Sequence, residues 1–124
     1  MQAVSIGVDV DGTLCVVLRG ELDFTNAREI AAMIGEAVRH RRPGSVRVDL
    51  AEVTFLDSSG IGLLVQAMRA AEDIRAGFRA ENPTDKVLDQ LRISGLLEPF
   101  GLTEAAPDPS GPGTRGSRQP DPSG

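Results

Sequence analysis

Residues 46–71 read VRVDLAEVTFLDSSGIGLLVQAMRAA, and this stretch contains the pattern of a strand followed by that of a helix. Val46, Val48 and Leu50 alternate with charged residues, which is typical of a strand with one buried face. After the polar residues 57–60, apolar residues recur at the spacing of a helix that buries one side. This predicted stripe consists of Ile61, Leu64, Val65, Met68 and Ala71. A strand that leads into an amphipathic helix is the repeating unit of α/β folds.

Outward from this unit, the N-terminal residues predict two further strands. Residues 4–10 alternate apolar with small or polar side chains, which indicates a half-buried strand. The dipeptide Asp11-Gly12 then favours a type I′ hairpin turn, because it tolerates positive φ. Residues 14–18 are apolar at nearly every position, so we expect an interior strand with both faces covered. Cys15 within it is interpreted as a small buried apolar residue rather than a reactive thiol.

A helix is predicted to follow residues 20–23, with either Asn26 or Thr25 as its N-cap. Asn26 stands three residues before Glu29, which is the spacing of a capping box. The apolar stripe of this helix consists of Ile30, Ile34, Ala37 and Val38. The basic residues 39–42 close the helix, where cations suit the negative end of the helix dipole. We interpret them as a solvated surface rather than a binding patch.

Three short segments complete the pattern of strands and connectors. Residues 51–56 are interpreted as a connector within the central unit, with Phe55 and Leu56 as core anchors. Residues 77–81 predict a weak strand, because they contain few apolar side chains. A last short strand is expected at 96–102, at an edge of the sheet, since its proline has no N–H to donate.

The third helix is predicted to begin at Asn82-Pro83, where the missing N–H of proline costs nothing. Its apolar stripe consists of Val87, Leu88 and Leu91. Gly95 is expected as the residue that follows the helix in a left-handed conformation. Strands that alternate with helices imply right-handed crossovers and mostly parallel pairing. We therefore predict an α/β fold: a mixed sheet of four or five strands with an N-terminal antiparallel hairpin and three or four helices packed on it.

The composition of the chain changes after Ala106. Residues 107–124 carry no large apolar side chain, so they cannot bury enough surface to offset their ordering entropy. We therefore expect one domain over residues 1–106 and a disordered tail over residues 107–124.

Charge and reactive side chains exclude several functions. The net charge of −5 at pH 7 argues against nucleic acid and anionic membrane as partners. One cysteine and one histidine cannot form an internal disulfide or a thiolate–imidazole zinc site. The only lysine, Lys86, does not follow a glycine, so a phosphate loop is absent, as is a Gly-x-Ser-x-Gly elbow. We expect neither enzyme activity nor a cofactor.

The N-terminal residues 1–5 lack the basic region of a signal peptide. No apolar run in the sequence reaches the ~20 residues that span a bilayer. The expected location is therefore the cytoplasm.

Residues 57–60, Asp-Ser-Ser-Gly, place a carboxylate and two hydroxyls at the entrance of the central helix. An N-cap role for Asp57 or Ser58 accounts for one or two of these polar groups. It does not account for all three followed by Gly60 and Gly62, so the residues alone support a capping and a functional interpretation equally. A phosphate is also well tolerated at a helix N-terminus, where free N–H groups and the dipole face it.

Two segments taken together resemble a known family. Residues 20–23, Gly-Glu-Leu-Asp, run into Thr25 and Ala27, and residues 57–63 follow at a suitable distance. These segments are similar to the first loop and the phosphorylation loop of STAS domains, specifically those of anti-sigma factor antagonists. Weaker similarities extend the resemblance over residues 4–102. Two departures are a strand at 77–81 that is poorer in apolar residues, and a polar tail in place of the family's terminal helix.

The resemblance implies a protein that binds an anti-sigma factor serine kinase and thereby frees a sigma factor in sporulation or stress response. Phosphorylation of Ser58, directly after the Asp of the motif, would release the kinase, and a PP2C-type phosphatase would restore binding. The partner-binding residues that it implies are Asp23, Phe24, Thr25, Asp57, Ser59, Gly60 and Ile61. It also allows a weak homodimer.

Two alternatives to this switch stay open at the level of the sequence. The first is a non-switching STAS subunit of a stressosome-like or transporter-associated assembly, which the intact Ser58 disfavours. The second is a small nucleotide-binding protein or enzyme, which the missing motifs disfavour.

Overall fold

The computed structural model describes residues 3–102, which form seven elements in the order β-β-α-β-α-β-α. They are β1 (Val4–Val8), β2 (Leu14–Leu22), α1 (Ala27–Arg41), β3 (Ser45–Leu56), α2 (Ser58–Asp73), β4 (Gly77–Glu81) and α3 (Asp85–Ile93). The strands lie in the order β1-β2-β3-β4, with β1 antiparallel to β2 and the other two pairs parallel. This confirms the predicted α/β fold with a mixed sheet and an N-terminal antiparallel hairpin.

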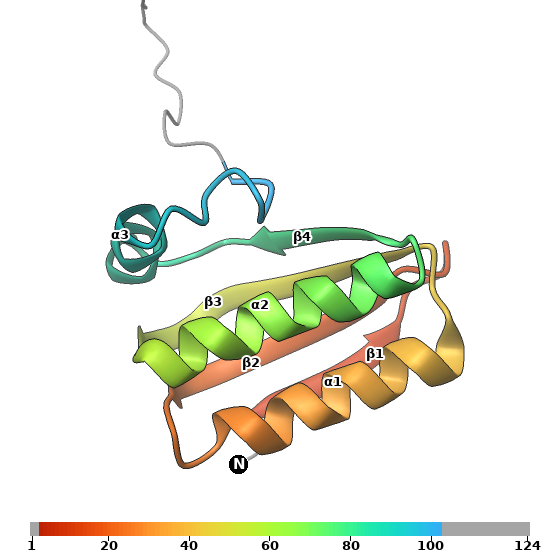
Figure 1. Cartoon of the computed structure of the whole chain (residues 1–124), viewed down its shortest axis with the longest axis horizontal. Coiled ribbons are helices and arrows are strands. Elements are labelled where there is room, and N and C mark those ends of the chain that lie inside the picture. The colour runs from red at the N-terminus through yellow and green to blue at the C-terminus, as the bar shows by residue number, and fades with distance from the viewer. Residues whose placement is uncertain (1–2, 103–124) are drawn as a thin grey trace, which may run out of the picture.

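Helices α1 and α2 lie side by side on one face of the sheet, and both begin at the same end of the molecule (Figure 1). Their buried residues and those of the strands form a core of Val, Ile, Leu and Ala side chains, joined by Phe100. Helix α3 lies at the end where α2 begins (Figure 1). The side chain of Gln90 fixes it there, because Nε2 donates to the Leu56 carbonyl at 2.6 Å and Oε1 accepts from the Leu56 N–H at 3.2 Å.

The second face of the sheet is only partly covered. Along β2, Leu14, Val16 and Leu18 are buried, whereas Cys15 and Val17 between them are half-buried. The prediction that both faces of this strand are covered is therefore wrong. The physical reason is that α1 and α2 pack on the same face of the sheet (Figure 1).

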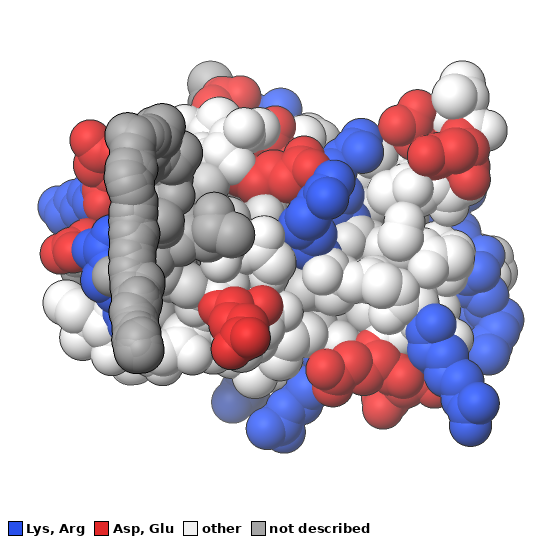
Figure 2. Space-filling model, turned by 90° about the horizontal axis from the view of Figure 1, so that it is seen from above, with Lys and Arg blue, Asp and Glu red and all other residues white. Residues whose placement is uncertain are grey.

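Charged side chains lie across this partly covered face. Arg47 pairs with Asp9 at 3.3 Å and with Glu81 at 3.4 Å, and its Nη2 also donates to the sulfur of Cys15 at 3.0 Å. Glu81 pairs in addition with Arg79 at 2.8 Å. Cys15 is thus half-buried beside a cation, a more polar setting than the predicted one. On a different side of the molecule, seen from above the view of Figure 1, Figure 2 shows acidic groups next to basic ones rather than a continuous basic stripe.

The turn of the β1–β2 hairpin differs from the prediction. Gly12 has a φ of +89°, and none of the other described residues of the turn has positive φ, so the turn is not type I′. The Asp9 carbonyl accepts from the Gly12 N–H at 3.0 Å, and the Thr13 carbonyl accepts from the Asp9 N–H at 2.9 Å. Strand β1 ends at Val8, and Val10 is fully exposed within the turn.

Strand β3 continues to Leu56, so residues 51–56 are strand rather than the predicted connector. Leu56 is buried as predicted, and Phe55 is half-buried. The strand continues because β2 pairs with it, through two register shifts, as far as the pair Leu22 and Leu56. Since these strands are parallel, the loops that follow them emerge next to each other.

Helix α1 begins without the predicted capping box. Asn26 is the N-cap residue, but its side chain makes no hydrogen bond to the helix. Its Oδ1 accepts from the Asp23 N–H at 3.0 Å, and its Nδ2 donates to the Glu21 carbonyl at 2.9 Å. Asn26 therefore fixes the preceding loop instead. The predicted apolar stripe is confirmed, with Ala37 half-buried and the other members buried.

The buried side of α2 is rotated relative to the prediction. Its buried residues are Gly60, Leu63, Leu64, Ala67 and Ala71. Three members of the predicted stripe, Ile61, Val65 and Met68, are only half-buried. The shift arises because α2 packs against α1 as well as against the sheet.

Helix α3 begins later than predicted. Asn82 has a φ of +58°, which is outside the helical region. The N-cap is Thr84, whose Oγ1 accepts from the Val87 N–H at 3.3 Å. Gly95, with a φ of +75°, follows the end of the helix as predicted.

Residues 96–102 form turns instead of the predicted edge strand. Phe100 is fully buried, and its ring centroid lies 5.6 Å from that of Phe78. The Phe100 carbonyl accepts from the Ala80 N–H at 2.9 Å, so a single hydrogen bond joins this segment to β4. The predicted tail over residues 107–124, and the domain boundary before it, lie outside the described residues.

Candidate functional site

Residues 22–25, at the end of β2 and in the loop after it, and residues 57–60, after β3, lie side by side at the start of α2, and we call them the loop junction. The Leu22 carbonyl accepts from the Asp57 N–H at 3.2 Å, which joins the two strand ends. The Oδ2 atom of Asp57 accepts from the Phe24 N–H at 3.3 Å. The two loops are thus bonded to each other at two points.

Asp57 is also the N-cap of α2. Its Oδ1 accepts from the Ser59 N–H at 2.7 Å and from the Gly60 N–H at 3.0 Å. This is one of the two caps that the sequence allowed. A single carboxylate therefore holds both the start of α2 and the loop after β2, and its charge suits the positive end of the helix dipole.

Gly60 lies where a side chain does not fit. A Cβ at this position would lie 2.3 Å from the Leu22 carbonyl oxygen. The glycine lets the first turn of α2 pack directly on the end of β2. Gly62 has no such role, because a Cβ there would meet nothing within 4 Å.

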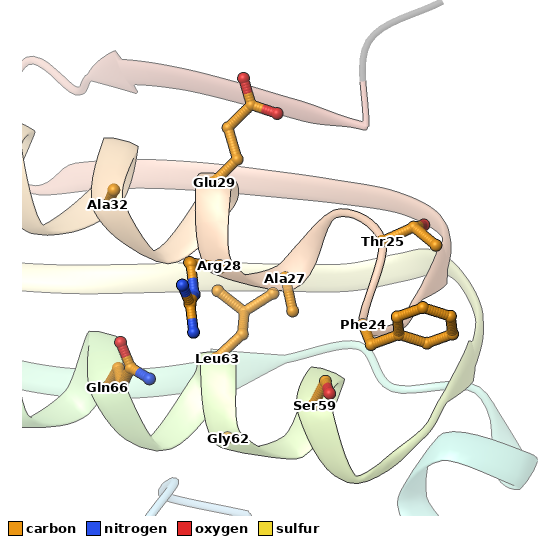
Figure 3. A pocket seen from close by; sticks show the side chains of 10 residues that line it. All are labelled: Phe24, Thr25, Ala27, Arg28, Glu29, Ala32, Ser59, Gly62, Leu63 and Gln66. Carbon is orange, nitrogen blue, oxygen red and sulfur yellow. The ribbon is translucent and has the colours of Figure 1, made fainter.

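The two serines of the loop junction face different surroundings. Ser58, the first residue of α2, is exposed. Ser59 is half-buried and lines a groove between α1 and α2 (Figure 3). Ser58 is therefore the more accessible hydroxyl to a modifying enzyme.

Asp23 is the second carboxylate of the loop junction. Its Oδ1 accepts from the Thr25 hydroxyl at 2.5 Å and from the Thr25 N–H at 2.9 Å. These bonds, the hydroxyl first, lower the pKa of Asp23 below its ordinary value. Asp23 is therefore anionic at neutral pH.

The groove between the first turns of α1 and α2 has a volume of about 720 Å³. Phe24 lies at its mouth with 79% of its surface exposed (Figure 3). Arg28 enters the groove from α1, and Leu63 and Gln66 enter from α2 (Figure 3).

The predicted site residues Asp23, Phe24, Thr25, Asp57, Ser58, Ser59 and Gly60 all lie in the loop junction, and Ile61 directly follows it. Sequence reasoning missed the Leu22 carbonyl and the groove residues Arg28, Leu63 and Gln66. Helical spacing could have found the last two, because they follow Ser59 by four and seven residues on one side of α2. No sequence signal marks the other two, since their role depends on how α1 and β2 are placed against α2.

Within residues 3–102, no group of three or more His, Cys, Asp or Glu side chains is arranged to hold a metal ion. Across that same range, none of the helices combines the length and the hydropathy that crossing a bilayer requires.

Fold and site together define a small α/β domain. At the N-terminus of its helix α2, two loops are hydrogen-bonded to the single carboxylate of Asp57. Residues 8–106 match the sequence profile of the STAS domain, and the chain belongs to the STAS-domain family. This confirms the resemblance drawn from residues 20–23 and 57–63.

Two relatives are anti-sigma factor antagonists by name. The chain is 31% identical over 84 residues to the anti-sigma F factor antagonist of Lysinibacillus sphaericus, which covers 68% of this chain and 72% of the relative. A crystal structure of an anti-sigma factor antagonist from Mycobacterium paratuberculosis is 26% identical, with a TM-score of 0.69 over 83% of this chain and 86% of that one.

A third similar structure is that of the Bacillus cell fate determinant SpoIIAA in its phosphorylated form. It is 28% identical, with a TM-score of 0.64 over 79% of this chain and 87% of that one. A sulfate transporter family protein from Wolinella succinogenes shares the fold alone, at 17% identity and a TM-score of 0.64 over 77% of this chain and 75% of that one.

Proposed function

We propose that this protein is an anti-sigma factor antagonist that acts by binding rather than by catalysis. Its unphosphorylated form binds an anti-sigma factor serine kinase and frees the sigma factor, and phosphorylation of Ser58 releases the kinase. The observation that carries the proposal is the exposed Ser58 hydroxyl directly after the Asp57 cap. The named relatives support the binding activity, and the phosphorylated form of SpoIIAA supports control by phosphorylation.

Phosphorylation of Ser58 adds a charge of about −1.5 to −2 at the first residue of α2. The helix dipole and its free N–H groups favour an anion at this end, so the phosphate leaves α2 folded. Asp23, which is anionic, lies in the same loop junction. The phosphorylated junction therefore presents a strongly negative surface on an intact fold.

Release then follows from electrostatic repulsion at the interface with the kinase. Like charges that are forced together in an interface cost on the order of several kcal/mol. A penalty of ~3 kcal/mol weakens binding about a hundredfold, which is sufficient for release. A PP2C-type phosphatase that removes the phosphate restores binding.

The test starts from the purified full chain and each anti-sigma factor kinase encoded in its source genome. Each kinase is titrated against the chain and then supplied with ATP, and the chain's intact mass and modified site are determined. We expect one kinase to bind and to add one phosphate on Ser58. Phosphate on Ser59 would overturn the assignment of the site, and the lack of any binding kinase would overturn the function.

Two variants separate binding from release. Ser58→Ala is expected to bind the kinase like the unmodified chain and to resist phosphorylation. Ser58→Asp is expected to bind markedly more weakly while its circular dichroism spectrum stays unchanged. Equal affinities of the two variants would contradict release by charge.

A further inference from the structure

The groove beside the loop junction combines a cation with an exposed aromatic side chain. The guanidinium group of Arg28 points between α1 and α2, beside the side chain of Leu63 (Figure 3). The neighbouring acid, Glu29, also lines the groove, but its carboxylate points away from Arg28 (Figure 3). Phe24, at the mouth, adds an exposed aromatic ring. The groove therefore offers a guanidinium group that no neighbouring acid pairs with, close to an exposed aromatic ring.

Arg28 makes no ion pair or hydrogen bond with any residue between 3 and 102. By contrast, Arg19 and Arg47 are each paired with an acid on the partly covered face of the sheet. Further arginines without such a pair lie in the C-terminal halves of α1 and α2 or directly after these helices, away from the loop junction. Arg28 is thus an available cation next to the site, in a chain with a net charge of −5.

A second hollow continues the groove along the two helices. Arg28 and Gln66 line both hollows, so Arg28 lies between them rather than at a rim. A partner that covers the groove removes water from the guanidinium group. An arginine that loses water without gaining an acceptor is strongly unfavourable, and a carboxylate satisfies its planar donors best.

We infer that this groove binds a segment of the anti-sigma factor kinase that carries a carboxylate, paired with Arg28, next to a large apolar side chain that packs on the exposed ring of Phe24. The inference rests on the proposed function, and it names the chemistry by which the partner is chosen. A kinase with a basic residue opposite Arg28 is rejected, because two cations would be desolvated next to each other without a counter-charge. Arg28 is thereby a specificity-determining residue.

The experiment titrates the kinase that binds in the preceding test against variants of the full chain. Arg28→Gln removes the charge, and we expect about a tenfold loss of affinity. Arg28→Glu opposes the partner's carboxylate, and we expect a loss of about a hundredfold or more. Glu36→Gln is the matched control, since it is an exposed charged residue of α1 that lines neither hollow, and the affinity of this variant is expected to stay within about twofold.

A charge reversal on the kinase identifies the carboxylate directly. Acidic residues of the kinase are changed to lysine one at a time, and one such change is expected to restore binding to Arg28→Glu while weakening binding to the unmodified chain. If Arg28→Glu binds like the unmodified chain, or if no reversal restores its binding, the inference is overturned and the proposed function stands. If no kinase binds the unmodified chain, the proposed function and this inference are both overturned.

Discussion

Gly60 is the residue of the loop junction that tolerates the least change. A Gly60→Ala substitution places a Cβ 2.3 Å from the Leu22 carbonyl oxygen, so the first turn of α2 must move away from β2. That movement also disturbs the hydrogen bonds between Asp57 and the helix N–H groups. We expect the free energy of unfolding to fall by about 2–4 kcal/mol, measured by urea denaturation.

Gly62→Ala is the matched control for this substitution. It lies on the next part of the same helix, and nothing within 4 Å meets its Cβ. Alanine is expected to raise the free energy of unfolding by about 0.5–1 kcal/mol, because it restricts the unfolded chain. Equal effects of the two substitutions would contradict the direct packing of α2 on the end of β2.

Thr25 controls the ionisation of Asp23. A Thr25→Val substitution removes the hydroxyl that is the larger cause of the lowered pKa of Asp23. We expect that pKa to rise toward the ordinary carboxyl value of ~3.9, measured by NMR titration of the carboxyl carbons. Asp11 is the internal control, because its pKa is lowered by bonds to Thr13 and should not change. An unchanged pKa of Asp23 in Thr25→Val would show that a group other than the Thr25 hydroxyl lowers it.

The same bond sets a direction for the pH dependence of stability. The pKa of Asp23 is lower in the folded than in the unfolded protein. Its contribution is therefore fully present above the unfolded pKa and is lost as the pH falls through the folded one. In Thr25→Val, ionised Asp23 contributes less to stability. The unmodified chain and Thr25→Val should therefore differ less in their free energies of unfolding at low pH than at neutral pH.

Among the elements, the segment after α3 shows how a turn can belong to the core. Phe100 is fully buried and packs edge-on against Phe78. We expect Phe100→Ala to lower the free energy of unfolding by about 3–5 kcal/mol, because it leaves a cavity under β4. Phe24→Ala is the control, since Phe24 is 79% exposed and should leave stability nearly unchanged. If Phe100→Ala and Phe24→Ala lowered the free energy of unfolding by similar amounts, Phe100 would not be part of the core.

Residues 51–56 and 96–102 show where a local pattern stops being informative. Residues 51–56 lack a simple alternation, yet they form a strand because β2 supplies hydrogen-bond partners along their length. Residues 96–102 are rich in apolar side chains like a strand, yet their main-chain groups bond within local turns, such as the Leu102 N–H to the Leu97 carbonyl. Both outcomes depend on distant partners that a single stretch of sequence does not display.

The residues of the candidate site likewise divide into those that a local stretch of sequence reveals and those that depend on distant partners. Residues 57–60 form a contiguous motif, so the sequence locates them and proposes the Asp57 cap. Arg28 and the Leu22 carbonyl are separated from that motif along the chain. They join it only through the packing of α1 and β2 against α2, which periodicity does not predict.

At the scale of the whole molecule, α1 and α2 both begin at the loop junction and end at the opposite side (Figure 1). Basic residues 39–41 occupy the last turn of α1. The positive ends of both helix dipoles therefore face the loop junction, and basic side chains compensate the negative end of α1. This arrangement favours an anion at the loop junction over one at the far end.

The extent of the domain can be tested by truncation. The composition of residues 107–124 leads us to propose that they lie outside the folded domain. Removing them is expected to leave Tm nearly unchanged, measured by differential scanning calorimetry of the full and shortened chains. A Tm that drops by many degrees would show that the segment contributes to folding.

The shared carboxylate of Asp57 has a consequence for timing. Because it bonds to the N–H groups of Phe24, Ser59 and Gly60, the two loops are already in place before any partner arrives. A partner that meets such a prearranged surface associates without waiting for the loops to order, and differences in affinity then appear mainly as differences in residence time. In the proposed switch, the rate would accordingly be set by how fast the phosphate is added and removed, not by any folding step in this chain.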